Sequence, residues 1–264
     1  MKTITLLTDF GLKDGNVGVM KGVILGIAPE VQLVDISHQI SPQNIAEAAL
    51  ILYRSAPYFP GGTVHVIVVD PGVGTVRRPI AGRIGDQFYV APDNGVLTMV
   101  LERAENLGLL IELYHLDKTG YWLHEISDVF HGRDIFAPVG AHLANAVSLQ
   151  NLGTRIHDMI RLRISQPEGI PRGLRGEIIH IDHFGNFSSN IRKEHLSDFR
   201  SVTVIFKDTV LDGLVKTFGE RKPGELVALF GSTGNLIISA VNGDAASILN
   251  AKIGDPIEVI TRDV

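Results

Sequence analysis

The chain contains no cysteine among its 264 residues. That absence excludes disulfide-stabilised scaffolds, thiolate metal sites and cysteine nucleophiles. Aromatic residues are also few, at 6%, while hydrophobic residues make up 45% and charged residues 20%. This composition is typical of a globular chain without a disordered tract. A chain of this length can bury a large core, either as one domain or as two of moderate size.

Two kinds of run are missing as well. Lysine and arginine form no cluster, and the net charge is −5, so nothing attracts a phosphate backbone and we expect no nucleic-acid partner. No apolar stretch approaches the length that spans a membrane, and the amino terminus reaches an acid, Asp9, too early for a signal peptide. We therefore expect a soluble, cytoplasmic protein with no membrane partner.

The first part of the sequence alternates short β-branched runs with amphipathic stretches. The expected strands are residues 3–8, 31–36, 64–69 and 88–91. Apolar side chains at helical spacing predict helices within residues 15–28, 45–55, 95–103 and 133–146. This alternation predicts an α/β domain over residues 1–166, with a mostly parallel sheet flanked by helices.

The pattern changes at residues 166–173, where two prolines and two glycines fall within eight residues, as expected of a domain junction. Beyond it the helical rhythm is nearly absent, and turns separate strand-like runs at 177–181, 202–206, 226–230, 236–241 and 256–261. This spacing predicts a smaller, all-β, barrel-like domain over residues 173–264.

The segment 68–77 carries a carboxylate, Asp70, and a guanidinium, Arg77, at the two ends of a glycine turn that follows an apolar strand. Ligands of open parallel sheets bind beyond the carboxyl ends of the strands. The glycines allow the turn to bring Arg77 back toward Asp70. Taken alone, the segment is more typical of a stabilising ion pair than of a reactive site.

Other polar groups also follow predicted strands. They are Asp9, the segments 93–95 and 130–134, and in the second domain the segment 180–186. Carboxylates accept hydrogen bonds from a ribose diol, amides contact a purine edge and aromatic rings cover its face, so this combination predicts a nucleoside site.

Two clusters contain residue types that bind metals. His180, Asp182 and His183 form one, and His124, Glu125 and His131 the other, but neither has the spacing of a zinc-binding helix. A structural or ligand-contacting role is the favoured interpretation, and we expect no metal. The remaining candidates, His38, His65 and His142, are interpreted as structural.

Together these motifs resemble the S-adenosylmethionine hydroxide adenosyltransferases, formerly a domain of unknown function and related to fluorinating and chlorinating enzymes. The similarity covers nearly the whole chain and lies in residues 8–14, 20–23, 69–74, 91–95, 130–138 and 182–186. The resemblance implies a hydrolase in which water or hydroxide displaces methionine from the 5′ carbon of S-adenosylmethionine, giving adenosine. S-adenosylmethionine is then the substrate, and no cofactor is expected. The resemblance also implies a homotrimer in which the first domain of one subunit and the β domain of its neighbour share each site.

The resemblance further implies an Asp, Arg and His set that prepares the nucleophile, and Asp70, Arg77 and His131 fall at the matching positions. The halogenating relatives do not keep this set, so its presence favours the hydrolase. By the same similarity, Asp9 contacts the ribose hydroxyls with Asp14 and Asn16 nearby, and Asp182 and Asn186 contact the methionine moiety and adenine. The stretch that closes the adenine pocket contains Phe230, Ser232, Val241 and Asn242.

The proton acceptor is left open by the sequence. An aspartate paired with arginine is expected to have a lowered pKa and to be a weak base, which favours His131 or a shared network. Three other functions also remain open. They are a halide-using adenosyltransferase of the same fold that forms 5′-halo-adenosine, a metal-dependent phosphohydrolase with Asp9, Asp70 and Asp182 as ligands, and a non-catalytic adenosine-binding protein.

Overall fold

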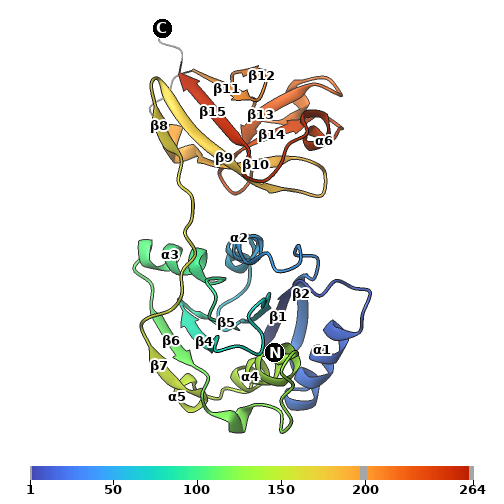
Figure 1. Ribbon diagram of the computed structural model, residues 1–264, viewed down its shortest axis with the longest axis vertical. Helices are drawn as coiled ribbons and strands as arrows, with labels where there is room; N and C mark the ends of the chain where they lie inside the picture. The colour runs from blue at the N-terminus through green and yellow to red at the C-terminus, as the bar shows by residue number, and fades with distance from the viewer. Residues whose placement is uncertain (1, 197–200, 262–264) are drawn as a thin grey trace. The chain divides into compact units, whose positions relative to one another are not determined.

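The apolar run after residue 63 forms a buried interior strand of a sheet in the computed structural model, which describes residues 2–196 and 201–261 (Figure 1). The chain divides into two compact units, residues 1–163 and residues 164–264. The first unit contains a seven-stranded sheet in the order β2-β1-β3-β5-β4-β6-β7. Its strands are β1 (Thr3–Thr8), β2 (Gln32–Ser37), β3 (Val64–Val68), β4 (Pro79–Ile84), β5 (Gln87–Pro92), β6 (Ile111–His115) and β7 (Thr154–Ile156).

The sheet is parallel from β2 through β1 and β3 to β5, and antiparallel from β5 onward through β4, β6 and β7. The predicted α/β class with a mostly parallel sheet and flanking helices is confirmed. The three strands of the antiparallel edge were not predicted. They are short, and β4 contains both a proline and a glycine, which weaken a strand signal.

Helices cover both faces of this sheet (Figure 1). They are α1 (Asn16–Ile27), α2 (Ile45–Ser55), α3 (Thr98–Asn106), α4 (Ala137–Ala144) and the short α5 (Leu149–Leu152). One hydrophobic core joins α1 and α4 to the sheet, and a second core joins α2 and α3 to it. Alternate residues of β3 point into the two cores, with Val66 in the first and Ile67 in the second. A strand buried on both faces explains why its sequence is an unbroken apolar run.

The second unit is an eight-stranded antiparallel, barrel-like sheet in the order β12-β11-β15-β9-β10-β14-β13, with β8 paired to β9. This confirms the predicted all-β, barrel-like domain. The strands are β8 (Glu168–Ile170), β9 (Gly173–Ile181), β10 (Phe187–Arg192), β11 (Val202–Phe206), β12 (Thr209–Asp212), β13 (Leu226–Phe230), β14 (Asn235–Ala240) and β15 (Pro256–Thr261), and a short helix, α6, spans Ala245–Leu249. Phe187 and Phe206 pack together in its core, with ring centroids 4.8 Å apart.

Strand β10 was missed because its middle is polar. Ser188, Ser189 and Asn190 are nevertheless buried. The Ser189 hydroxyl donates to the Leu236 carbonyl at 3.0 Å, and the Asn190 side-chain oxygen accepts from the Glu177 N–H at 2.9 Å. Backbone partners on neighbouring strands thus satisfy these side chains, which a single sequence does not reveal.

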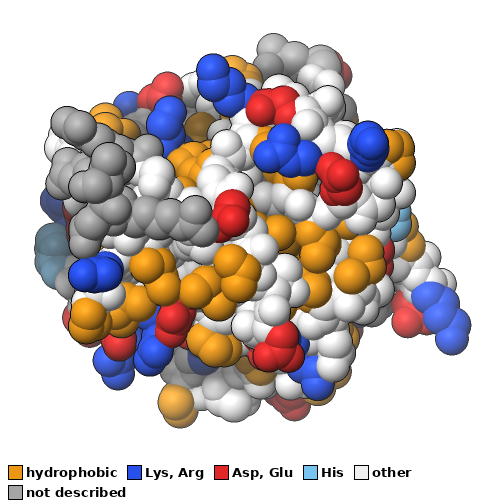
Figure 2. Space-filling model, turned by 90° about the horizontal axis from the view of Figure 1, so that it is seen from above, with side chains coloured by type: hydrophobic (Ala, Val, Ile, Leu, Met, Phe, Trp, Pro, Cys, Tyr) orange, Lys and Arg blue, Asp and Glu red, His pale blue; other side chains and the backbone are white. Residues whose placement is uncertain are grey.

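Figure 2 shows one face of the molecule, on which Lys and Arg side chains stand among Asp and Glu and hydrophobic side chains form a band between them. Among the described residues on this face, basic and acidic side chains are therefore interspersed. Within residues 2–196 and 201–261, no helix combines the length and apolar character needed to cross a membrane.

His65 is a buried histidine in the middle of β3. Its Nδ1 lies 2.7 Å from the Thr5 hydroxyl, and its ring packs 4.9 Å from the Tyr89 ring. Burial lowers the pKa of His65 from 6.5 to about 4. The folded protein therefore resists protonation of this ring, whereas the unfolded chain accepts a proton near pH 6.5.

We predict that the free energy of unfolding decreases by up to about 3 kcal/mol through His65 as the pH falls from 6.5 to 4. Below that range the contribution is constant, because the folded protein is then protonated as well. Urea unfolding of the wild type and of His65→Gln at pH 7 and pH 4.5 measures the difference. An equal loss of stability in both proteins would contradict the prediction.

Candidate active site

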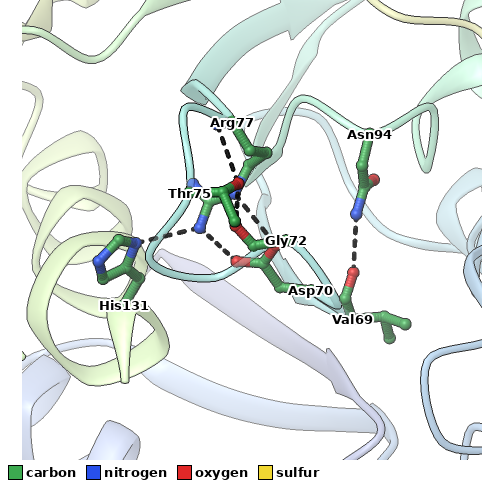
Figure 3. A network of polar contacts seen from close by, with 7 residues as sticks. All are labelled: Val69, Asp70, Gly72, Thr75, Arg77, Asn94 and His131. Atoms are coloured by element: carbon green, nitrogen blue, oxygen red, sulfur yellow. Dashed lines mark hydrogen bonds and ion pairs between the residues drawn. The ribbon is translucent and has the colours of Figure 1, made fainter. Parts of the chain in front are cut away.

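Asp70 lies two residues beyond the end of β3, where a turn leads toward β4 (Figure 3). The strand end is fixed by Asn94, whose side-chain amide donates to the Val69 carbonyl at 2.9 Å. Arg77 returns to Asp70 across the turn: its Nε donates to one carboxylate oxygen at 3.0 Å, and its Nη2 donates to the other. The two side chains are only 5% and 6% exposed. The pair is thus a bidentate, buried contact, which holds both groups in a fixed orientation.

The turn between them is held by its own side chains and by one glycine. The Thr75 hydroxyl donates to the Gly72 carbonyl at 2.7 Å and accepts from the Arg77 N–H at 3.3 Å. Gly74 has a φ of 74°, and a Cβ at this position would collide with the Asp128 carbonyl oxygen. Glycine is required here both by the backbone conformation and by the close approach of a second loop.

His131 comes from a distant part of the chain and meets the same guanidinium. Nη2 of Arg77 lies 3.0 Å from Nδ1 of His131, and the Arg77 guanidinium lies 5.3 Å from the centre of the Phe136 ring. Because arginine only donates hydrogen bonds, Nδ1 must accept, which assigns the proton of the neutral imidazole to Nε2. The structure therefore brings Asp70, Arg77 and His131 into contact.

His131 precedes a π-helical turn, η3 (Gly132–Phe136), that leads directly into α4. Burial lowers the pKa of His131, and the positive charge of Arg77 lowers it further, while Asp70, Asp134 and Asp128 oppose the shift. The imidazole is consequently neutral at pH 7, in agreement with the accepting role of Nδ1.

Burial raises the pKa of Asp70, and this effect outweighs the opposing charge and hydrogen bonds of Arg77. The expectation that the paired arginine would leave Asp70 with a lowered pKa was therefore wrong. The sequence shows the partner but not the loss of solvent around the carboxylate, and here the loss of solvent dominates. Asp70 is a stronger base than an exposed aspartate.

The carboxylate and the imidazole face a cavity of about 340 Å³. The cavity is lined by Asp9, Phe10, Pro42, Gln43, Val68, Asp70, Pro71, Val73, Val129, Phe130, His131 and Gly132. Asp9 is thus on the same cavity as Asp70, and one of its oxygens accepts from the Gln43 N–H at 2.8 Å. The walls are largely apolar and aromatic, with the two carboxylates of Asp9 and Asp70, as in a small-molecule site.

Asp14 and Asn16 do not line this cavity. Both side chains are exposed, and Asn16 is the first residue of α1. Asp93 does not line it either: it is buried, paired with Arg78 and bonded to the Ile160 N–H at 2.9 Å.

In the second unit, Asp182 and Asn186 are the two ends of the turn between β9 and β10. One oxygen of Asp182 accepts from the Asn186 N–H and the other from its side-chain amide, both at 2.9 Å. Phe184, between them, is 73% exposed. The turn therefore holds its acid and amide together and presents an aromatic ring to its surroundings.

The four residues expected near adenine fall into two groups. Phe230 and Ser232 lie at the turn that joins β13 to β14, whereas Val241 and Asn242 lie at the opposite end of that hairpin. The second end is also the one nearest the Asp182 turn, because Gly185 accepts a hydrogen bond from the Ala246 N–H at 2.9 Å. Within this unit, Val241 and Asn242 accompany Asp182 and Asn186, and Phe230 and Ser232 do not.

Several lining residues were not singled out from the sequence. Gln43 has a φ of 66°, an uncommon conformation for a residue with a side chain, and no sequence signal predicts it. Phe10 and Phe130 belong to motifs that were identified, and their rings meet edge to face at 5.8 Å beside the cavity. The described part of the chain contains no group of three or more His, Asp or Glu side chains arranged to hold a metal ion.

Comparison with known proteins gives consistent results for both units. Residues 4–153 match the family model of the SAM hydroxide adenosyltransferase N-terminal domain, and residues 176–258 match that of the C-terminal domain. The (R)-S-adenosyl-L-methionine hydrolase of Salinispora tropica is 36% identical over 259 residues, which is 97% of each chain. A fluorinase of an Actinoplanes species is 30% identical over 289 residues, covering 95% of each chain. A crystal structure of an uncharacterized conserved protein from Thermotoga maritima superimposes with a TM-score of 0.89 at 40% identity, covering 97% of this chain and 99% of that one.

We predict that the pKa of His131 responds to its two charged neighbours in opposite directions. Arg77→Gln removes a repulsive positive charge and should raise the pKa, whereas Asp70→Asn removes an attractive negative charge and should lower it. Titration of the imidazole by NMR measures both changes. His142, whose pKa is lowered by burial alone, is the internal control and should not move. An unchanged His131 in both variants would show that the three groups are not in contact in solution.

Proposed function

The chain belongs to the S-adenosylmethionine hydroxide adenosyltransferase family, and from that premise we propose that it hydrolyses S-adenosyl-L-methionine to adenosine and L-methionine. The curated relatives named (R)-S-adenosyl-L-methionine hydrolase support this reaction. The observation that carries the proposal is the contact of Asp70, Arg77 and His131 beside a cavity that also contains Asp9.

The reaction is a displacement at the 5′ carbon. The oxygen of water forms a bond to C5′ while the bond from C5′ to sulfur breaks, and the electron pair of the broken bond stays on sulfur. Methionine leaves as a neutral thioether, so no acid is needed to assist it. The water loses one proton, and water is a weak nucleophile until that proton is removed or shared. The demand on the protein is therefore to orient one water molecule and to accept its proton.

We assign to Asp70 the role of accepting the proton that the attacking water loses. Its pKa is raised by burial, which makes the carboxylate a stronger base than usual, and it faces the cavity. His131 is less suited to this role, because its Nδ1 already accepts from Arg77 and its Nε2 carries the proton. In the proposed mechanism the Nε2–H group of His131 donates a hydrogen bond to the water oxygen and so orients the water.

Arg77 connects the other two groups. Its positive charge favours the ionised form of Asp70 and stabilises negative charge as it develops on the water oxygen. Its hydrogen bond to Nδ1 selects the tautomer of His131. A lysine would not reproduce this arrangement, because three directed contacts from one planar group are needed.

The ribose is assigned to Asp9, which keeps one carboxylate oxygen free of the Gln43 contact. Asp14 and Asn16 are exposed and lie outside the cavity, so we propose that they come near the ribose only when the substrate is bound. Asp182 and Asn186 are proposed to contact the methionine moiety and adenine, with Val241 and Asn242 at the same end of the β unit.

We also propose, from the family resemblance, that the protein is a homotrimer in which neighbouring subunits complete each site. The proposed contacts of the ligand are divided between the two units of the chain. Light scattering on the purified protein should give three chain masses. A monomer with full activity would contradict this assembly.

The halide-using reaction is the main competitor, because fluorinases are among the relatives. It is separated by supplying S-adenosylmethionine with and without fluoride or chloride and resolving the nucleosides by chromatography. The hydrolase forms adenosine at the same rate in all cases. Supplying the two sulfonium epimers of the substrate separately shows which epimer is used.

We propose that no metal takes part, so a chelator should leave the rate unchanged. Adenosine that stays bound without turnover would instead indicate a binding protein.

We predict that Asp70→Asn and Arg77→Ala lower kcat by at least about 100-fold, as expected for the loss of a positioned base or of its partner. Binding of adenosine, measured by calorimetry, should change much less. Asp158→Asn is the matched control, because it removes an exposed aspartate from an ion pair with Arg78. If either active-site variant kept full activity, that residue would have no part in catalysis.

A further inference from the structure

Asp134 is a fully buried carboxylate three residues beyond His131. It does not line the cavity, and both of its oxygens are occupied. Arg133 donates to one oxygen at 2.5 Å and to the other at 3.1 Å, and the Ser127 N–H donates to the second oxygen at 2.8 Å. A buried charge with this many donors is held in one position, and it holds its donors in turn.

The backbone of the same residue binds the other end of the preceding loop. The Leu123 N–H donates to the Asp134 carbonyl at 2.9 Å. Residues 123–130 are therefore tied to Asp134 at two points, one near the start of the loop and one near its middle. The widened π-helical turn at Gly132–Phe136 begins directly after His131 and contains Asp134.

The loop so held forms part of the cavity and contacts the catalytic turn. Val129 and Phe130 line the cavity beside His131. The carbonyl of Asp128 lies so close to Gly74 that no side chain fits between them. Movement of this loop would therefore change the turn that carries Asp70 and Arg77 as well as the wall of the cavity.

We propose that Asp134 is a positioning residue, which clamps residues 123–130 against the turn of Gly74 and thereby keeps His131 in contact with Arg77. It touches neither the substrate nor the water in the proposed reaction. Its effect on turnover rests on the proposed function, whereas its effect on the loop and on His131 does not.

The charge of Asp134 gives the clamp a second, measurable consequence. The charged groups that influence His131 are Arg77, Asp70, Asp134 and Asp128, and of these Arg77 alone lowers its pKa. Replacing Asp134 by asparagine keeps the shape of the side chain and removes one of the negative charges. The pKa of His131 should then fall, and protonation of its ring should require a lower pH.

The test uses Asp134→Ala and Asp134→Asn in the full-length protein. Asp134→Ala removes the acceptor of the Ser127 N–H and is expected to accelerate amide hydrogen exchange at Ser127 at least tenfold, with no change in β3. It should lower kcat at least tenfold while KM changes less than threefold. Asp134→Asn keeps an oxygen for the Ser127 N–H, so it should restore most of the protection and part of kcat, with a lowered pKa of His131 by NMR.

Asp93→Asn is the matched control, because Asp93 is likewise buried, outside the cavity, paired with one arginine and bonded to one loop N–H, but is not among the charged groups that influence His131. It should leave kcat and the titration of His131 unchanged. If Asp134→Ala does not fold, the pKa of His131 measured by NMR in Asp134→Asn tests the proposal instead. Wild-type exchange at Ser127 in the folded alanine variant, or a wild-type pKa of His131 in the asparagine variant, would overturn the proposal.

These readouts separate the two hypotheses. If the wild type does not hydrolyse S-adenosylmethionine, the proposed function fails, but exchange and titration still decide whether Asp134 holds the loop. If the wild type is active and the variants behave like it in exchange and titration, the positioning role alone is wrong.

Discussion

The buried pair of Asp70 and Arg77 is the interaction on which the site depends. Removing two charges from water is costly, and the cost is offset here by a bidentate contact and by a third partner, His131. The same burial makes the carboxylate more basic and the imidazole less so. One desolvated ion pair thus positions three groups and sets the protonation state of two of them.

The architecture was largely predictable because most of it follows from local patterns. The strand at 3–8 and the helix at 45–55 have the predicted bounds, since their apolar spacing continues to their ends. The helix expected at 133–146 is instead a π-helical turn, Gly132–Phe136, followed by α4 at Ala137–Ala144. Strand β6 pairs with β4 and β7, both distant in sequence, and local patterning carries little of that information. Strands β4 and β10 each form a hairpin with a neighbouring strand, β5 and β9, but their glycine, proline or polar residues weaken the strand pattern.

The contact between Arg77 and Asp70 was predictable from the sequence, but the electrostatics of the site were not. A glycine turn after a buried strand predicted that Arg77 reaches Asp70, and the family resemblance supplied His131, 54 positions further along the chain. The sign of the shift in the pKa of Asp70 depends on how much solvent the fold removes, which no motif encodes. The clamp by Asp134 was equally hidden, because its partners Leu123 and Ser127 have no distinctive sequence.

The pH dependence of kcat/KM in His131→Asn decides most directly whether Asp70 takes the proton. Asparagine can still accept from Arg77 and donate toward the cavity, but it does not titrate. If Asp70 is the base, the decline in rate at low pH persists in this variant, with a midpoint above the ordinary pKa of an aspartate. A rate that no longer falls at low pH would assign the proton to His131 and contradict the role given to Asp70.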